Sequence, residues 1–249
     1  MRIAIFSDVH AHLPALEAVL ADISASGVEA TYVLGDLVGY APWPNEVLAR
    51  LEAEAIPSVM GNYDDGTGFD RDECGCAYTD PVEKALGDRG FAWTKAHTSG
   101  EHKAFLRTLA PQIRFEADGR RYLLVHGSPR RMNEYLHEDK PDETFARIAA
   151  GADADVIVCG HTHRPYDKRV GAARFINVGS AGKPKDGDPR ACWALLDTAA
   201  DSVEFHRVAY DVEAAARSIE ASDLPHEFAD QLREARGYQA AVAGLRQSR

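Results

Sequence analysis

The sequence predicts an α/β protein, because short apolar runs alternate with segments of helical period over about its first 60 residues. Three of these runs are predicted to be buried strands, at residues 3–6, 31–35 and 56–60. Two helices are predicted between them, at residues 13–26 and 44–53. The first helix carries apolar side chains at helical spacing and ends before Gly27, a residue that favours the C-terminal stop of a helix. This alternation is typical of βαβ units on a parallel or mixed sheet.

The alternation breaks at residues 64–112, where the turn-rich stretch DDGTGFDRDECG is followed by helical segments. We interpret this part as an inserted helical cap. Strand patterns then return at residues 114–118, 121–126, 156–160, 174–179, 190–197 and 202–210. The remaining residues, 211–249, are predicted to form a helical tail. Without an internal repeat or a low-complexity linker, residues 1–249 are predicted to be a single domain.

Composition limits the classes of function. The chain has 249 residues, of which 45% are hydrophobic and 27% charged, as is ordinary for a globular protein with a sizeable core. Its formal charge of −11, with no offsetting run of lysine or arginine, argues against polymeric nucleic acid as a partner. Because the first residues lack an export signal and no segment approaches about 20 apolar residues, we expect a soluble, cytoplasmic protein that does not bind membranes.

The four cysteines do not indicate a disulfide scaffold. Cys159 and Cys192 stand in apolar runs and are predicted to be core thiols. Cys74 and Cys76 form an isolated CGC sequence without the partners that a zinc site needs, and we interpret them as inert.

Polar residues that could carry chemistry all follow the predicted strands, which is where α/β sheets build their sites. Five strands supply seven such side chains: Asp8, His10, Asp36, Asn62, His126, His161 and His163. Single members of this set could cap turns or be hydrogen-bonded core histidines, but those roles give no reason for the whole set to collect at strand ends. Glycine adjoins four of the seven, which would let the backbone turn tightly there: Gly35, Gly61, Gly127 and Gly160.

The chemistry of this set indicates a metal centre. Imidazole nitrogens with carboxylate and amide oxygens, and no thiolate, suit Mn, Fe, Zn or Co better than soft Cu(I). Seven ligands are too many for one catalytic zinc, which usually takes three protein ligands. Two metal ions that share a bridging carboxylate would use the whole set.

The segments SDVH, GDLVGY, GNYD, VHG and GHTH resemble the five ordered motifs of the calcineurin-like metallophosphoesterase superfamily. The resemblance covers roughly residues 1–185. The segments GYAPWPNE, HGSPRR and NVGSAGKPKDGDPR are similar to the small bacterial phosphodiesterase branch related to diadenosine tetraphosphatases. The resemblance implies an α/β fold, a four-layer αββα sandwich of two mixed β-sheets flanked by helices, with the site at one edge.

The resemblance also implies an activity and an assignment of ligands. Asp8, His10 and His163 would hold one divalent ion, Asn62, His126 and His161 would hold the other, and Asp36 would bridge them. Manganese is favoured, with Fe, Zn, Co or Ni as alternatives. A metal-bridging hydroxide would attack phosphorus and hydrolyse a phosphodiester or nucleotide-type phosphoester, so that the partner is a small phosphoester such as a nucleotide.

The sequence departs from the family pattern at Tyr63, where many relatives carry a histidine that is thought to assist the leaving group. Tyrosine can donate a hydrogen bond to a substrate phosphate, but with a pKa of about 10 it is a poor proton shuttle at neutral pH. Either another group helps the leaving group or the enzyme prefers good leaving groups. We hypothesise that His12, two residues beyond a ligand, is the substitute. Arg130 is predicted to bind a substrate phosphate, with a solvated surface residue as the alternative.

Two rival functions stay open at this point. One is a phosphomonoesterase or phosphoprotein phosphatase, since the same metals would serve both reactions. The other is a metal-binding scaffold that has lost catalysis, for which Tyr63 gives some support.

Lys183 and Lys185 are interpreted as exposed basic residues of a loop, and Trp43 as a residue that packs a helix or stacks on a nucleobase. A homo-oligomer is left open.

Overall fold

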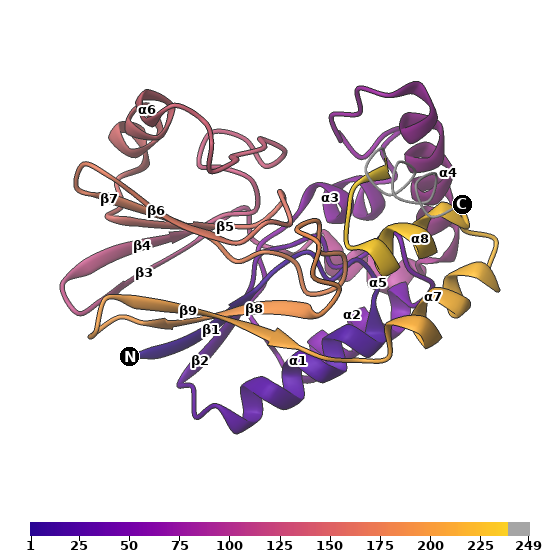
Figure 1. The fold of residues 1–249 in the computed structure, drawn as a ribbon, viewed down its shortest axis with the longest axis horizontal. Helices are drawn as coiled ribbons and strands as arrows, with labels where there is room; N and C mark the ends of the chain where they lie inside the picture. The colour runs from indigo at the N-terminus through magenta and orange to yellow at the C-terminus, as the bar shows by residue number, and fades with distance from the viewer. Residues whose placement is uncertain (239–249) are drawn as a thin grey trace.

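The computed structural model describes residues 1–238, which form two mixed β-sheets with helices on their outer faces (Figure 1). The first sheet has the order β2-β1-β8-β9, with β1 (Arg2–Phe6), β2 (Ala30–Val33), β8 (Ala191–Asp197) and β9 (Ser202–Val208). The second has the order β3-β4-β5-β7-β6, with β3 (Ile113–Ala117), β4 (Arg120–Leu124), β5 (Val156–Cys159), β6 (Tyr166–Val170) and β7 (Ala173–Asn177).

Both sheets combine parallel and antiparallel pairs. In the first, β1 pairs in parallel with β2 and antiparallel with β8. In the second, β5 is flanked by parallel β4 and β7, while the edge strands β3 and β6 are antiparallel to their neighbours. The carboxyl ends of β1, β2, β4 and β5 therefore lead into loops on one side of the molecule, as a site at one edge requires.

The two sheets stack face to face, and helices cover the outer face of each. Alternate residues of β1 show this arrangement, because Ile3 and Ile5 pack in the cluster between the sheets while Ala4 and Phe6 pack toward the helices. Helices α1 (Leu13–Ala25) and α2 (Pro44–Ala53) cover the first sheet, and α6 (Asp142–Ala152) covers the second (Figure 1). The predicted four-layer αββα sandwich is confirmed.

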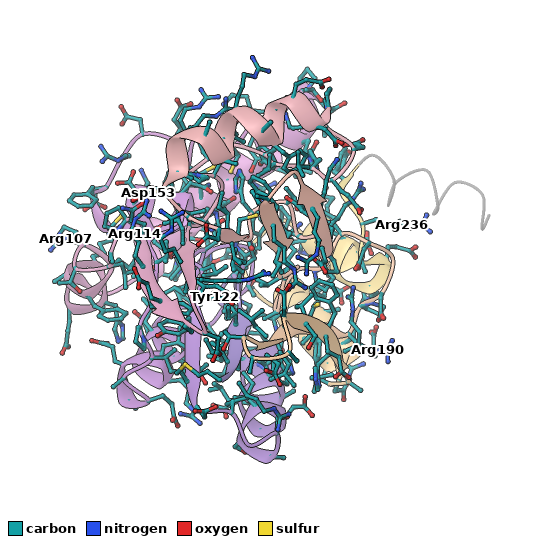
Figure 2. The ribbon with its side chains drawn as sticks, turned by 90° about the vertical axis from the view of Figure 1, so that its left-hand side faces the viewer. Arg107, Arg114, Tyr122, Asp153, Arg190 and Arg236 are labelled. Carbon is teal, nitrogen blue, oxygen red and sulfur yellow. The ribbon has the colours of Figure 1, made fainter. Side chains whose placement is uncertain are left out.

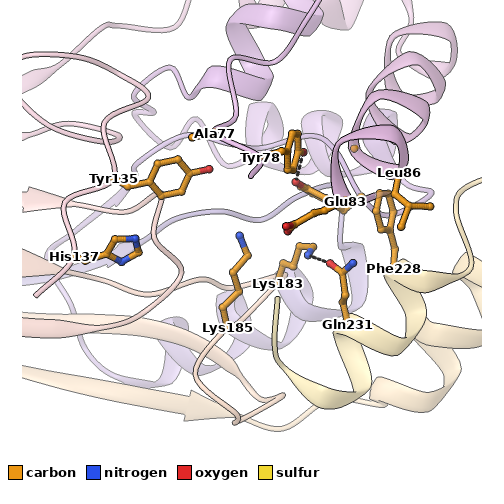
Figure 3. Close-up of a pocket in the computed structure, with 12 residues that line it drawn as sticks. Ala77, Tyr78, Glu83, Leu86, Tyr135, His137, Lys183, Lys185, Phe228 and Gln231 are labelled. Carbon is orange, nitrogen blue, oxygen red and sulfur yellow. Dashed lines mark hydrogen bonds between the residues drawn. The ribbon is translucent and has the colours of Figure 1, made fainter. Parts of the chain in front are cut away.

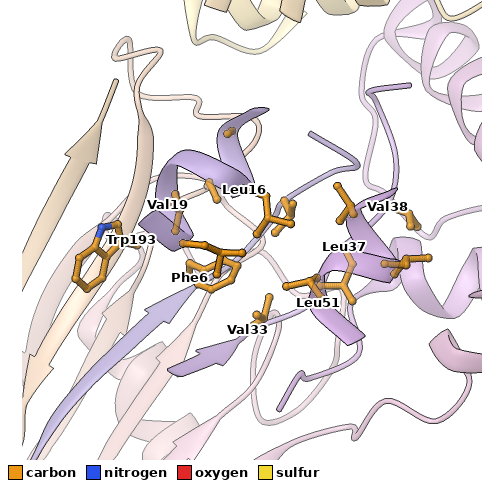
Figure 4. Close-up of a cluster of buried hydrophobic side chains, with 14 of the residues drawn as sticks. Phe6, Leu16, Val19, Val33, Leu37, Val38, Leu51 and Trp193 are labelled. Atoms are coloured by element: carbon orange, nitrogen blue, oxygen red, sulfur yellow. The ribbon is translucent and has the colours of Figure 1, made fainter. Parts of the chain in front are cut away.

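The layer between α1 and the first sheet shows why the first predicted helix forms. Its buried positions include Leu16 and Val19, which meet Phe6, Val33 and the ring of Trp193 in one cluster (Figure 4). Burying each of these large apolar side chains contributes about 1.5–3 kcal/mol. Helix α1 ends at the predicted place, where Gly27 adopts a left-handed backbone with φ +63°.

Helix α6 is the outer layer over the second sheet and was not predicted from the sequence. Its apolar side is narrow, with Phe145 and Ile148 packed on the sheet. Arg114 of β3 donates to the carbonyl oxygens of Ala152 and Asp153, which end the helix (Figure 2). Figure 2 also places Tyr122 within the sheets, whereas three arginines point outward from the rim: Arg107, Arg190 and Arg236.

A lobe of helices stands beside the carboxyl ends of the strands (Figure 1). It contains α3 (Asn62–Gly68), α4 (Pro81–His97), α5 (Gly100–Leu106), α7 (Val212–Glu220) and α8 (Glu227–Glu234). Helix α3 begins two residues before the predicted cap, α4 and α5 fall within it, and α7 and α8 fall in the predicted tail. Leu86 of α4 packs in one cluster with Ile219, Phe228 and Leu232 of the tail. Cap and tail thus form one wall rather than separate appendages.

Two strand assignments need correction. Residues 56–60 are not a strand, because they make only two isolated bridges, Val33 with Ser58 and Val59 with Ala110. Pro57 has no N–H to give to a ladder, which explains why pairing stops there. The prediction also missed β6, an edge strand whose YDKRV sequence is mostly polar.

Residues 239–249 of the predicted helical tail lie outside the described residues. Within residues 1–238, the helices are too short or too polar to cross a bilayer.

Candidate metal centre

Loops that follow the strands bring the seven predicted ligands together, and their backbone is unusual. Five of the seven have a positive φ: Asp8 at 54°, His10 at 50°, Asp36 at 51°, His161 at 64° and His163 at 59°. The left-handed region is uncommon for residues other than glycine, and each such residue costs on the order of 1–3 kcal/mol. The surrounding structure must therefore hold these turns in place, which is typical of a functional site.

The loops approach one another closely enough that glycine is required at two contacts. A Cβ on Gly61 would lie 2.1 Å from the backbone nitrogen of Asp36. A Cβ on Gly160 would lie 2.1 Å from Ser7 Oγ and 2.6 Å from Asp8 Oδ2. Glycine at these positions lets the loop of one ligand touch the loop of another.

One group of three buried side chains, Asp8, His10 and His163, could hold a metal ion. Nε2 of His163 lies 3.3 Å from Asp8 Oδ1 and 3.3 Å from Nε2 of His10. Among the described residues, Asp8 Oδ1 has no hydrogen-bond partner although it is buried. A buried carboxylate oxygen in this state is costly unless a cation satisfies it.

The second group consists of Asp36, His126 and His161. Nε2 of His126 lies 3.1 Å from Nδ1 of His161 and 3.4 Å from Asp36 Oδ2. The amide oxygen of Asn62 is 3.1 Å from the same His126 nitrogen, so a fourth donor faces this group.

Asp36 stands between the two groups. Its Oδ2 is 3.8 Å from Nε2 of His10 in the first group and 3.4 Å from Nε2 of His126 in the second. Its other oxygen accepts a hydrogen bond of 2.8 Å from the backbone N–H of Tyr63, which fixes the carboxylate. Asp36 is therefore the carboxylate that could be shared between the two groups.

Backbone carbonyls set the orientation of three histidines. In each of them Nδ1 faces a backbone carbonyl oxygen: His10 faces that of Val38, His126 that of Leu34 and His163 that of Lys183. A carbonyl only accepts, so Nδ1 carries a proton in each of the three, and Nε2 is the nitrogen that faces the centre. Such carbonyl partners are typical of histidines that bind metals.

Burial adjusts the charge of the donors. It lowers the pKa of His10 to about 3 and holds those of His161 and His163 well below the usual value, so these imidazoles are neutral. Burial raises the pKa of Asp8 to about 7. Burial alone would lower the pKa of His126, but the Asp36 carboxylate beside it outweighs this and raises the pKa to about 10. The proton between Asp36 and His126 stands where a divalent ion would replace it, so the donor set fits a pair of ions.

Cys74 and Cys76, which we interpreted as inert, contribute to this centre indirectly. The side-chain amide of Asn62 donates to the carbonyl oxygen of Cys74 at 2.9 Å and to the sulfur of Cys76 at 3.5 Å. These contacts turn the amide oxygen of Asn62 toward His126. The CGC turn thus supports a candidate metal ligand, which its spacing alone did not reveal.

Asp64 is a further supporting residue that sequence reasoning missed. Its two carboxylate oxygens accept from the backbone N–H groups of Leu37 and Gly61 at 2.8 and 2.9 Å. They therefore join the loop of Asp36 to the loop of Asn62. The acidic residue that closes the GNYD motif was the signal that could have identified it.

Tyr63 is buried against the centre, with its ring edge-on to His10 at 5.4 Å. Its hydroxyl lies 3.4 Å from that of Tyr78, which is 3.1 Å from that of Tyr40. Burial raises the pKa of Tyr63 well above its usual value, so the phenol is neutral and can donate a hydrogen bond.

The structure does not bring His12 to the metal-binding groups. Its Nδ1 accepts from the N–H of Ala15 at 3.2 Å and caps α1, and its ring packs against Tyr210 and Trp43. Trp43 therefore packs at the start of α1 and against the cluster that Leu86 forms with the C-terminal helices. Burial lowers the pKa of His12 to about 4, which leaves little charged imidazole at neutral pH.

Arg130 is also outside the centre. Its Nε donates to Glu134 Oε2 at 3.0 Å, and a second guanidinium nitrogen contacts the other carboxylate oxygen. The predicted contact of Arg130 with a substrate phosphate would require this pair to open.

A cavity of about 340 Å³ lies beside the centre (Figure 3). Cap residues such as Tyr78, Glu83 and Leu86 form one side, and Phe228 and Gln231 of α8 form another. Lys183 and Lys185 also line it, and Lys183 is only 5% exposed, so they are not the exposed loop residues that we predicted.

Comparison with known proteins agrees with this geometry. A calcineurin-like phosphoesterase superfamily domain matches residues 1–201. The crystal structure of a metallophosphoesterase from Sphaerobacter thermophilus is 32% identical, covers 94% of this chain and 100% of its own, and superposes with a TM-score of 0.78.

Two curated proteins extend the comparison. The uncharacterized protein MJ0912 of Methanocaldococcus jannaschii is 31% identical over 92% of this chain and 96% of its own length. Phosphodiesterase YfcE of Escherichia coli is 26% identical over 79% of this chain and 88% of its own length. The resemblance predicted from five short motifs is confirmed, and the chain belongs to the calcineurin-like phosphoesterase superfamily.

Proposed function

We propose that this protein holds two divalent metal ions and hydrolyses phosphodiester or nucleotide-type phosphoester bonds. The observation that supports it best is the place of Asp36, whose Oδ2 lies within 4 Å of a histidine nitrogen from each of two metal-binding groups. One ion would be held by Asp8, His10 and His163, and the other by Asn62, His126 and His161, with Asp36 shared. Bound ions would supply positive charge to the phosphoryl oxygens and a water acidic enough to react at neutral pH.

The protein's own groups position the substrate rather than protonate its leaving group. Tyr63 is neutral and offers an O–H donor, and its hydroxyl contacts that of Tyr78, which in turn contacts that of Tyr40. His12 is occupied as a helix cap, and its part in catalysis stays a hypothesis. Because Tyr63 is a weak acid and His12 is engaged as a helix cap, we propose that good leaving groups are preferred, as in nucleotides and activated diesters. The cytoplasmic location and the oligomeric state stay predictions.

Hydrolysis of bis-p-nitrophenyl phosphate and of p-nitrophenyl phosphate tests the proposed reaction. With Mn²⁺ we expect turnover of the diester to exceed that of the monoester by at least about tenfold, and chelation to remove both activities. Faster turnover of the monoester would favour a phosphomonoesterase. No turnover of either ester with Mn²⁺, Fe²⁺, Zn²⁺, Co²⁺ or Ni²⁺, despite bound metal, would favour the scaffold without catalysis.

Replacing Tyr63 by phenylalanine removes only the hydroxyl. Because a neutral hydrogen bond to the reacting phosphate contributes about 0.5–1.5 kcal/mol, we expect kcat to fall roughly three- to tenfold without loss of bound metal. Steady-state kinetics on bis-p-nitrophenyl phosphate, with Tyr122→Phe as a control for a phenol within the sheets, measures the effect. Unchanged kcat for Tyr63→Phe would show that its hydroxyl takes no part.

A further inference from the structure

The cavity shown in Figure 3 adjoins both metal-binding groups. Tyr40 in its wall is edge-on to the ring of His10, with ring centres 4.8 Å apart. Tyr135 in its wall packs on the ring of His161, with ring centres 4.0 Å apart. A phosphoester bound at the centre would therefore extend part of its structure into this cavity.

Two lysines give the cavity a cationic wall. The Lys183 ammonium donates to Gln231 Oε1 and lies 4.3 Å from the centre of the Tyr40 ring. The Lys185 ammonium points into the cavity (Figure 3), and within the described residues it makes neither a hydrogen bond nor an ion pair. Among residues 1–238, no carboxylate pairs with either ammonium group. An anion in the cavity would supply the missing compensation.

The remaining charge on the lining is small. Glu83 is the acidic residue among the residues that line the cavity, and within residues 1–238 it makes no ion pair with either lysine. His137 also lines it, and burial lowers the pKa of that imidazole, which favours its neutral form. The lining thus has two cations and one anion on a protein whose formal charge is −11. Such a local reversal of sign favours an anion at this place, against the overall charge of the protein.

We propose that Lys183 and Lys185 bind a second phosphate group of the substrate, one that is not cleaved. The inference rests on the proposed phosphoesterase function and narrows its substrate to phosphoesters with a further phosphate, such as nucleotides with two phosphates. Two ammonium groups match a phosphate monoester, which carries about −1.5 to −2 charges at pH 7, better than a carboxylate.

The side of the cavity next to these lysines is formed by the C-terminal helix α8. Gln231, the partner of Lys183, lies on α8, and the family match ends at residue 201. Phe228 on the same helix packs at 4.9 Å against Tyr40, which closes that side. The second phosphate site therefore depends on the C-terminal helices as well as on the GKPK segment that carries both lysines.

A matched pair of substrates tests the inference. The p-nitrophenyl ester of thymidine 5′-phosphate and its 3′-phosphorylated form share the bond that is cleaved and differ by one phosphate. We expect wild-type kcat/KM to favour the 3′-phosphorylated ester by at least about tenfold, as for one charge-assisted contact. Lys185→Gln should reduce that ratio to about one to three.

Three further variants separate a specific contact from a general effect of charge. Lys185→Arg keeps the positive charge and should keep most of the preference. Glu83→Gln removes the opposing charge and should raise the ratio. Lys84→Gln changes net charge as Lys185→Gln does, but at an exposed lysine paired with Asp88, and should leave the ratio unchanged.

Calorimetry supplies a readout that does not depend on turnover. Thymidine 3′,5′-bisphosphate should bind at least about tenfold more tightly than thymidine 5′-phosphate, with and without Mn²⁺, and Lys185→Gln should abolish the difference. Equal rates and equal affinities for the two members of each pair in the wild type would overturn the second phosphate site. In that case, hydrolysis of both esters would leave the proposed function intact. Absence of hydrolysis with the binding preference retained would instead refute the proposed function alone.

Discussion

Replacing Asp36 by asparagine is expected to lower kcat/KM on bis-p-nitrophenyl phosphate by at least about 1000-fold, or about 4 kcal/mol of transition-state stabilisation. The reason is geometric, because the same carboxylate oxygen faces His10 in one group and His126 in the other. Asparagine keeps the size of the side chain but removes the charge that both ions would share. We therefore expect bound manganese to fall from two ions to fewer than one per chain, measured by elemental analysis after dialysis.

Asp64→Asn is the matched control for this variant. Asp64 is as buried as Asp36 and lies in the same loop cluster, but it binds backbone N–H groups rather than facing the histidines. Its replacement should lower the free energy of unfolding by about 1–3 kcal/mol while two ions stay bound. Similar metal loss in both variants would mean that Asp36 acts through loop structure and not as a shared ligand.

Gly61→Ala is expected to lower the free energy of unfolding by about 3 kcal/mol or more and to reduce activity at least about 100-fold. The added methyl group would meet the backbone nitrogen of Asp36 at 2.1 Å and its Oδ1 at 2.3 Å. Backbone cannot rotate away as a flexible side chain can, so the loops that carry Asp36 and Asn62 must separate. Urea unfolding and kinetics on the folded variant measure the two effects.

Gly151→Ala is the control, because a Cβ at Gly151 would meet nothing within 4 Å and the residue is helical. Alanine there should raise the free energy of unfolding by up to about 1 kcal/mol and leave activity unchanged. If Gly61→Ala were as stable and as active as Gly151→Ala, the close contact between the two ligand loops would be wrong.

The strand-end motifs predicted the members of the candidate centre because their signal is local. Each pair such as Asp8 and His10 follows a recognisable apolar run, and parallel strands bring their carboxyl ends to one edge. Residues 56–60 show the limit of the same reasoning: an apolar run reads as a strand even where Pro57 prevents continued pairing.

The cavity could not be predicted in the same way. Lys183 is buried because α8 packs against it, and its partner Gln231 lies 48 residues further along the chain. No spacing rule relates two such residues, so the sequence predicts that a lysine in a glycine-rich loop is exposed. Similarly, the CGC turn orients Asn62 only because the carbonyl oxygen of Cys74 accepts from the Asn62 amide. That contact forms only when the cap is folded, so the sequence alone does not reveal it.

Anomalous diffraction from crystals grown with Mn²⁺ tests the shared role of Asp36 most directly. We expect two peaks about 3.5–4 Å apart, with a carboxylate oxygen of Asp36 contacting both. One peak should lie among Asp8, His10 and His163, and the other among Asn62, His126 and His161. A single peak in full-occupancy crystals, or two peaks of which Asp36 contacts only one, would contradict the dinuclear centre.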